Sequence, residues 1–389
     1  MTMSEIRPPT ARRVTRRRFL QVSATGAIAV SVLGAAGGAA ARPYDGPFTW
    51  ISPRGTLEVL DDYGYWIAKE MGYFGDLDIA IEPGPSDGTA TVKFVAVGQA
   101  DMGFPSPGVL SFAIANDMDL VSVFNVGAVD VFDFAFRKGE GVTDLRQLEG
   151  KKVLLGSAAW QAITDPMFAA AGADPKKIEY IEAGWPQWGA VLASGEGDAA
   201  LAWEGLRADW QGKGLDFEYW LGQRSSPFPA NVFVVRRADF EDPDRRAFLE
   251  RYLRGWAMGM EYGHLNPRAA TDIVFRRFPV VERNLGPELA VESQMQLAAV
   301  FRGDMSKRQG WGWHDMAAWE LFFKTLADIG QVKRAVDVPA VIRNDLIGAI
   351  NDFDRAKVKA DAEAWKLSDA LAAVDVDAIR ARFFANVVN

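Results

Sequence analysis

Apolar and polar positions follow two alternating periodicities along the first third of the chain. Short alternating or fully apolar runs predict strands at 48–51, 77–82, 100–104 and 120–125. Between them, apolar residues recur every three or four positions, which predicts helices at 57–71, 89–97 and 108–116. Because strands and helices take turns, the pattern predicts an α/β sheet covered by helices on both faces.

A second series of the same kind begins at residue 144. A strand precedes Gly156, and further strands are predicted at 178–181, 199–203 and 231–235. From Pro243 onwards the apolar periodicity is helical. The sequence therefore predicts two similar α/β units and a helical C-terminal extension.

The first 41 residues follow neither pattern and have the features of an export signal. Six arginines precede a weakly apolar stretch at 22–36, and small residues ending in Ala39-Ala40-Ala41 follow it. The run Thr15–Gln21 is similar to the twin-arginine export consensus and departs from it only at the last position, usually Lys. The apolar stretch is shorter than the roughly 20 residues needed to span a membrane. We expect cleavage near Ala41 and a mature chain in the periplasm, exported by the twin-arginine pathway, with no stable membrane insertion.

Composition removes several classes of function. The 389 residues carry a net charge of −8, and without residues 1–41 the balance is 37 basic against 50 acidic residues, a net −13. Such a charge argues against binding to nucleic acid, whose phosphates require a basic surface. The chain has no cysteine, which excludes disulfides, zinc–thiolate sites and a lipid-anchoring cysteine. With only two histidines, His264 and His314, we expect no metal site and no cofactor.

Four local motifs give the chain a family resemblance. Residues 66–74 are similar to an A-x-x-x-G-Y/F-F segment, and 97–103 to a G-x-A-D-x-G turn. Residues 144–153 are similar to a D-L-K-G-K-x-V segment, and 195–199 to a G-x-x-D-A turn. In this order and spacing, the motifs resemble those of periplasmic solute-binding proteins of ABC importers. The subgroup is the one that binds taurine, alkanesulfonates, nitrate and pyrimidine precursors of thiamine.

The resemblance implies a two-lobed periplasmic binding protein fold of type II. Each lobe would be a mixed sheet flanked by helices, with the helical C-terminal extension added to the first. Lobe one would comprise 42–133 and 235–389, and lobe two 137–228, with hinges near 132–137 and 228–235. The resemblance also implies a small-molecule ligand, the permease subunits of an ABC transporter as partners, and a monomer.

Ligand contacts are expected in the loops that follow the strands, because sites in open α/β sheets lie there. Gly156 and Ser157 occupy the place of a ligand-contacting turn in the family, and Glu204 could accept hydrogen bonds from an amino group. The tryptophans could enclose a flat ring, although tryptophans in such lobes are usually part of the core. The candidates are Arg54, Asp61, Phe104, Ser106, Ser157, Trp160, Trp185, Trp188, Trp203 and Glu204.

These candidates favour a planar, nitrogen-containing ligand such as a pyrimidine. A sulfonate- or nitrate-type anion is the alternative, which would require Arg54 or several N–H donors. A periplasmic enzyme on the same fold is a further alternative, but the chain has no Gly-x-Ser-x-Gly, P-loop or dinucleotide motif. It also lacks the cysteine-rich motif of the related pyrimidine synthases, so we expect no enzyme. The tryptophans around His314 have helical spacing with Trp319, which favours core packing over a metal site.

Overall fold

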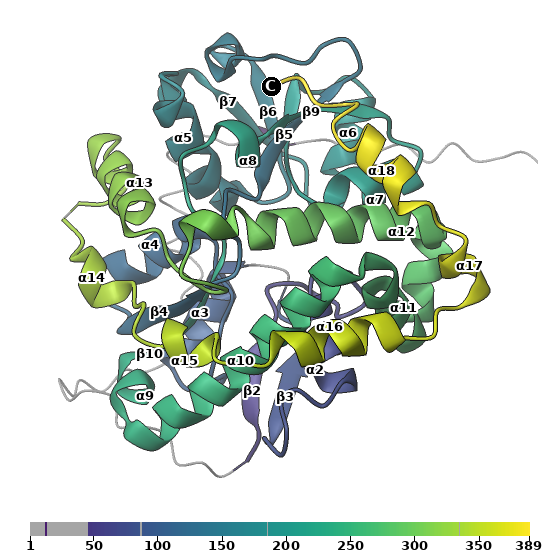
Figure 1. Ribbon diagram of the computed structural model, residues 1–389. Helices are drawn as coiled ribbons and strands as arrows, with labels where there is room; N and C mark the ends of the chain where they lie inside the picture. Colours follow the sequence, from purple (N-terminus) through teal and green to yellow (C-terminus); the bar gives the residue numbers. More distant parts are fainter. Residues whose placement is uncertain (1–11, 14–45, 86–87, 185, 334) are drawn as a thin grey trace, which may run out of the picture.

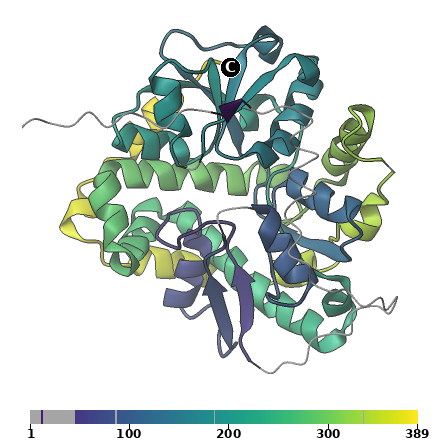
Figure 2. The ribbon, with the colours of Figure 1, turned by 180° about the vertical axis from the view of Figure 1, so that it is seen from behind.

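The computed structural model describes residues 12–13, 46–85, 88–184, 186–333 and 335–389 (Figure 1). The predicted export signal lies outside these residues except for Arg12–Arg13, which form the short strand β1. The chain folds into two lobes, with the long helix α12 (Pro279–Arg302) lying between them (Figures 1 and 2).

Lobe one is built around two strand pairs that single bridges join. β2 (Phe48–Ile51) runs parallel to β3 (Ile79–Glu82), and β4 (Leu120–Asn125) runs antiparallel to β10 (Val232–Arg236). The strand predicted at 100–104 is reduced to two bridges, from Met102 to β2 and from Gly103 to β10. The adjacent Asp101 carboxylate accepts a hydrogen bond from the Thr49 amide (2.9 Å). A side chain therefore takes the place of a backbone acceptor from a neighbouring strand.

Lobe two holds a six-stranded mixed sheet in the order β1-β7-β6-β8-β5-β9. β6 is parallel to β7 and β8, whereas β5 is antiparallel to β8 and β9. The strand bounds are β5 Phe132–Arg137, β6 Lys152–Leu155, β7 Glu179–Glu182, β8 Ala199–Trp203 and β9 Phe217–Leu221.

The chain passes between the lobes at two neighbouring segments. Residues 126–131 lead from β4 to β5, and residues 226–231 lead back to β10. Residues 132–137, expected as the first hinge, form β5, and the connection comes just before them. The Cβ that Gly127 lacks would lie 2.4 Å from Ala230 Cβ, so only glycine allows the two segments to pack this closely. The division into lobes that move about these segments stays a prediction.

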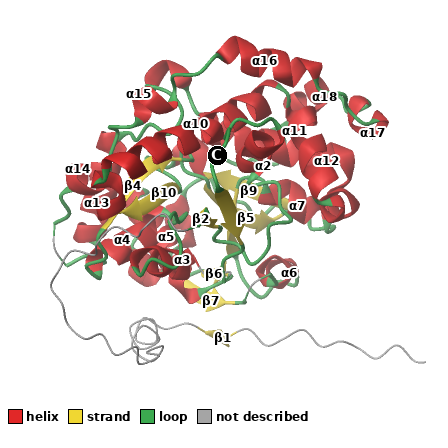
Figure 3. Ribbon diagram, turned by 90° about the horizontal axis from the view of Figure 1, so that it is seen from below, coloured by secondary structure: helices red, strands yellow, loops and turns green. Residues whose placement is uncertain are grey.

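Helices surround the strands of both lobes and make up most of the C-terminal part (Figure 3). Several begin at a side chain that caps the first turn, with proline next, as at Asp242-Pro243 and Asn266-Pro267. The remaining helices are α2 Tyr63–Glu70, α3 Gly88–Ala96, α4 Pro107–Ala115, α5 Gln161–Ala170, α6 Trp188–Ala193, α7 Leu206–Gly212, α8 Gly222–Ser225, α9 Arg237–Glu241, α10 Pro243–Leu265, α11 Pro267–Arg277, α13 Met316–Asp328, α14 Val338–Val341, α15 Ile347–Ile350, α16 Arg355–Ala364, α17 Asp369–Ala372 and α18 Val376–Arg382. Short 3₁₀ turns lie at Leu145–Leu148, Ala158–Trp160, Pro175–Lys177 and Met305–Lys307.

The helix predicted at 57–71 is shorter than expected. Helix α2 starts at Tyr63, and residues 52–62 form a loop. The loop is held by Arg54, whose guanidinium binds Asp61 and Asp62. Pairing of charged side chains seven and eight residues apart therefore holds a loop where the periodicity predicted a helix.

The tryptophan-rich segment near His314 is core, as predicted. Trp311, Trp319 and His314 are fully buried. The His314 ring lies between the Ser122 hydroxyl (2.7 Å from Nε2) and Asn344 Oδ1 (3.0 Å from Nδ1). Burial lowers the pKa of His314 to about 3, so the ring is neutral. Among the described residues, no helix is both long and apolar enough to cross a bilayer.

Candidate ligand-binding site

A cavity of about 140 Å³ lies between the two lobes, next to the crossing segments. Its walls come from the loop after β2, the start of α4, both crossing segments, the start of α5, the end of β8 and one face of α12. The lining residues are Pro53, Arg54, Gly55, Asp61, Phe104, Ser106, Val109, Gly127, Val131, Phe132, Trp160, Ile163, Leu201, Trp203, Ala230, Asn231, Leu297 and Phe301. A mostly apolar cleft with a few polar groups is typical of small-molecule sites.

Six of the ten candidate residues line this cavity, and they come from both lobes. Lobe one contributes Arg54, Asp61, Phe104 and Ser106, and lobe two contributes Trp160 and Trp203. The structure therefore brings together residues that are up to about 150 positions apart in the sequence, because strand ends from both lobes face the same cleft.

Two tryptophans form the aromatic wall of the cavity, and a third supports them. Trp160 and Trp203 meet edge to face, with ring centroids 6.0 Å apart. Trp188 lies behind them, stacked on Trp203 at 5.7 Å and edge-on to Trp160 at 5.6 Å. Its indole N–H donates to the Leu201 carbonyl (2.7 Å). Trp188 is 1% exposed and does not line the cavity, so it packs against the two wall tryptophans on their side away from the cavity.

Two further candidates do not line the cavity. Ser157 does not line the cavity, and its hydroxyl accepts from Ala159 N (3.4 Å) at the start of a 3₁₀ turn. Glu204 is fully buried behind the wall, where it binds Arg207. Side chains alternate along a strand, so Trp203 and Glu204, at the end of β8, point in opposite directions. Trp185 lies outside the described residues.

The polar corner of the cavity is formed by Arg54 and two carboxylates. The guanidinium of Arg54 donates to Asp61 (2.9 Å) and Asp62 (2.6 Å), and lies over the Phe104 ring at 5.7 Å. Burial opposes the charge on Arg54, but the two aspartates outweigh it and raise its pKa. Burial also raises the pKa of Asp62 to about 6, although Arg54 acts against this shift. Of these two carboxyl groups, only Asp61 lines the cavity, and Asp62 is buried at the other terminal nitrogen of the guanidinium.

Asn231 is a cavity residue that the sequence did not reveal. Its Oδ1 atom is buried and has no hydrogen-bond partner among the described residues. An acceptor in this position needs a donor, because an unsatisfied buried polar atom costs about 1–3 kcal/mol. The sequence places Asn231 at the start of a strand, and only the two prolines before it, Pro227 and Pro229, signal an irregular segment. Leu297 and Phe301, one helical turn apart on α12, were also missed because that region shows only helical periodicity.

Two helices, one from each lobe, begin at the cavity. Ser106 caps α4 by accepting from Val109 N (3.3 Å), whereas α5 continues directly from the 3₁₀ turn Ala158–Trp160, which Ser157 caps. Helix N-termini carry partial positive charge and free N–H groups, which attract anions and carbonyl oxygens. The site therefore combines an acidic corner with two positively polarised helix ends.

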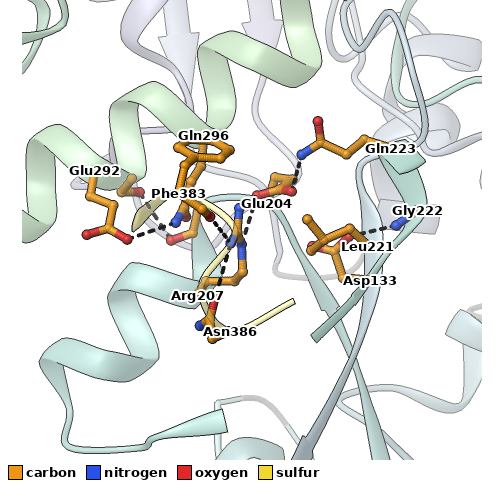
Figure 4. Close-up of polar contacts among 12 residues, drawn as sticks. Asp133, Glu204, Arg207, Leu221, Gly222, Gln223, Glu292, Gln296, Phe383 and Asn386 are labelled. Atoms are coloured by element: carbon orange, nitrogen blue, oxygen red, sulfur yellow. Dashed lines mark hydrogen bonds and ion pairs between the residues drawn. The ribbon is translucent and has the colours of Figure 1, made fainter. Parts of the chain in front are cut away.

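Three buried acids, Asp130, Asp133 and Glu204, lie in or beside the first crossing segment and the end of β8, and Figure 4 shows the last two. Asp130 accepts from Phe132 N (3.0 Å) and from the Ser226 hydroxyl, which joins the two crossing segments. Burial raises the pKa of Asp130 to about 7, and burial together with Glu204 raises that of Asp133 well above its usual value. No set of three or more acidic or histidine side chains in the described part of the chain is arranged to hold a metal ion.

Solved structures with this architecture include periplasmic binding proteins. The aliphatic sulphonate-binding protein SsuA from Escherichia coli superposes with a TM-score of 0.57 at 14% identity, covering 77% of this chain and 98% of its own. The nitrate-binding protein NrtA from Synechocystis PCC 6803 gives 0.55 at 14% identity, covering 82% and 99%. A Candida albicans gene product, described as having the generic periplasmic binding protein fold, gives 0.55 at 12% identity, covering 76% and 95%. This chain therefore has the periplasmic binding protein fold, as its motifs predicted.

Within that class the family can be stated. The profile of the family described as NMT1/THI5 like matches residues 61–270, more than half of the chain. The chain belongs to this family. A comparison with curated protein sequences found no match.

Proposed function

We propose that this protein is an exported solute-binding protein that captures a planar, nitrogen-containing molecule such as a pyrimidine. The ligand would sit in the cavity between the lobes, and the closed complex would deliver it to the permease of an ABC importer. The observation that carries the proposal is the pairing of an aromatic wall with an acidic corner in one cavity. Export by the twin-arginine pathway and a monomeric state are parts of the same proposal.

The aromatic wall supports a flat ligand. Trp160 and Trp203 come from lobe two and Phe104 from lobe one, so a ring between them would contact both lobes. Ring-to-ring contacts contribute about 0.5–1.5 kcal/mol each beyond the burial of apolar area. These contacts exist together only when the lobes are close. The ligand would therefore bind the closed state more tightly than the open state and shift the protein toward the closed state.

The polar groups support a ligand that donates hydrogen bonds. Asp61 accepts at one edge of the cavity, and the unpartnered Oδ1 of Asn231 accepts at another. A ring amino group or a protonated ring nitrogen supplies such donors. Arg54 does not favour an anion strongly, since both of its terminal nitrogens already bind carboxylates.

A sulfonate or nitrate ligand is the second candidate, and the two helix starts favour it. The N-termini of α4 and α5 approach the cavity from opposite lobes, and such ends bind anions. SsuA and NrtA, which share this fold at low identity, are named as sulphonate- and nitrate-binding proteins. For this candidate, Asp61 would have to turn away from the ligand or be neutralised.

A thermal-shift panel separates the two candidates. The chain from residue 42 is purified, any co-purifying compound is identified by mass spectrometry, and the melting temperature is measured with 4-aminopyrimidine, butylamine, ethanesulfonate and nitrate. A ligand present at about 100 times its Kd stabilises the folded chain by roughly 2.7 kcal/mol. We expect the shift with 4-aminopyrimidine; a shift with ethanesulfonate or nitrate alone would overturn the pyrimidine proposal.

The same samples test the enzyme alternative. If the shifting compound is recovered unchanged after prolonged incubation with the protein, the protein is a binder. Conversion of that compound would instead assign a catalytic function.

A further inference from the structure

Residues 383–389 cross from the α12 side of the molecule to the edge of the lobe-two sheet, and we call them the strap (Figure 1). The Tyr219 amide in β9 donates to the Asn386 carbonyl (2.8 Å), and the Val388 amide donates to the Tyr219 carbonyl (2.9 Å). The strap thus extends the six-stranded sheet beyond β9.

The Asn389 side chain fixes the far end of the strap. Its Oδ1 accepts from Leu221 N (2.9 Å), and its Nδ2 donates to Leu221 O (2.9 Å) and Ser225 Oγ (2.8 Å). Both polar atoms of this amide are therefore bonded, and the strap is held in one register against β9.

The near end of the strap is tied to the helix that lines the cavity. Arg382, at the end of α18, binds Glu288 (2.7 Å) and Glu292 (3.0 Å) of α12. Leu297 and Phe301, which line the cavity, lie on the same helix, about one and a half and two and a half turns beyond Glu292. The segment therefore connects α12 to the outer edge of lobe two.

Arg207 links the middle of the strap to the cavity wall (Figure 4). One terminal nitrogen donates to Phe383 O (3.0 Å) and Asn386 Oδ1 (3.4 Å). Nε and the other terminal nitrogen donate to Glu204 Oε2 (3.1 and 2.9 Å). Glu204 follows Trp203 directly, and its amide donates to Val131 O (3.0 Å) in the first crossing segment.

Burial makes this connection stiff. Arg207 is 3% exposed and Glu204 is fully buried. A buried ion pair tolerates little displacement, because removing one partner leaves an uncompensated charge in an apolar environment. The strap supplies two of the acceptors for the Arg207 guanidinium, so it completes the set of bonds that this charge requires.

We propose that the strap is a positioning element of the ligand site. It fixes Arg207, and through Glu204 it holds Trp203 in the cavity wall. Part of this inference, that the cavity holds the ligand, rests on the proposed function; the link from strap to wall does not.

Hydrogen exchange tests the link without any ligand. The full chain is compared with a chain lacking residues 386–389 and with Asn389→Ala, which removes only the side-chain bonds at the far end. We expect amides at 199–206 to exchange about tenfold faster in both, since tenfold corresponds to roughly one lost buried hydrogen bond. Amides of β2 in lobe one should not change, and Arg380→Ala, which alters an exposed ion pair in α18, serves as the matched control.

Faster exchange confined to 217–221 would overturn the proposal, because an edge segment that only covers β9 would affect β9 alone. If the shortened chain does not fold, Asn389→Ala gives the same test. The affinity for 4-aminopyrimidine should fall about five- to tenfold in Asn389→Ala, which is roughly 1 kcal/mol. Unchanged affinity would overturn the role at the ligand site, whereas a full chain that binds no compound of the panel would instead contradict the proposed function.

Discussion

Gly108 and Ala162 bring the two lobes into direct backbone contact. Gly108 lies in the first turn of α4 in lobe one, and the Cβ that it lacks would lie 2.4 Å from the carbonyl oxygen of Ala162 in α5 of lobe two. Both helices begin at the cavity, so this contact sets how closely its two walls approach.

Gly108→Ala should therefore weaken ligand binding by forcing the lobes apart. A contact below 3 Å with backbone requires movement, and we expect affinity to fall at least about tenfold with a larger radius of gyration in the presence of ligand. Calorimetry and small-angle X-ray scattering measure both. Gly348→Ala is the control, because nothing lies within 4 Å of its added Cβ. Equal affinity in the two variants would show that the α4–α5 contact does not limit closure.

Trp203→Ala and Trp188→Ala should separate ligand contact from support. Trp203 lines the cavity, so its loss should lower affinity by about 1–2 kcal/mol with a modest effect on folding. Trp188 is buried behind it, and its loss leaves a void that costs about 3–5 kcal/mol of unfolding free energy. Denaturant unfolding and binding titrations distinguish the two. The idea fails if Trp203→Ala keeps full affinity for a ligand that binds the parent chain.

Asp61→Asn should change which ligands bind. It removes a carboxylate from the cavity while Arg54 remains, so we expect weaker binding of 4-aminopyrimidine, by about tenfold, and stronger binding of ethanesulfonate. Asp62→Asn is the matched control, since Asp62 binds the same arginine but does not line the cavity. Its main effect should be on stability. Stronger binding of 4-aminopyrimidine by Asp61→Asn would contradict the acidic-corner argument.

Glu204→Gln should destabilise the protein strongly. The substitution leaves the buried Arg207 without its charged partner, which costs about 3–5 kcal/mol. Glu363→Gln, which alters the exposed pair with Lys359, should cost less than about 1 kcal/mol. Urea unfolding of both variants is the measurement. A loss of affinity from Glu204→Gln without loss of stability would place Glu204 in direct contact with ligand instead.

Asp130→Asn should reduce the loss of stability with rising pH. Burial raises the pKa of Asp130 from 3.8 to about 7, so the folded chain holds this proton over a range where the unfolded chain has released it. Its stabilising contribution is therefore full below about pH 4 and is lost as the pH rises through about 7. The difference between the pKa of Asp130 in the unfolded and in the folded chain corresponds to roughly 4 kcal/mol of unfolding free energy.

The measurement is the difference in unfolding free energy between the parent chain and Asp130→Asn at about pH 5 and about pH 8. Asparagine keeps an acceptor for the Phe132 amide, so the variant should gain relative stability at the higher pH. His314, whose lowered pKa acts in the opposite direction, is common to both chains and cancels. An identical pH dependence of the two chains would show that Asp130 does not titrate in this range.

Local patterns in the sequence were enough to predict the alternation of strands and helices, the family motifs and the core position of the tryptophans near His314. They also led to Arg54, Asp61, Phe104, Ser106, Trp160 and Trp203, because strand-end loops can be recognised from neighbouring residues alone. Periodicity failed at 57–71, where Arg54 pairs with Asp61 and Asp62 and holds a loop in place of the predicted helix.

The tertiary structure decided which of these residues face the cavity and which support it. Trp203 and Glu204 are neighbours in sequence, yet one lines the cavity and the other is buried against Arg207, because strand direction and packing set the side to which each points. Asn231, Leu297 and the contacts of residues 383–389 with β9 depend on segments that are distant in the chain. The sequence alone indicated most of the strands and helices and most of the candidate side chains. Only long-range packing brought those side chains to one cavity.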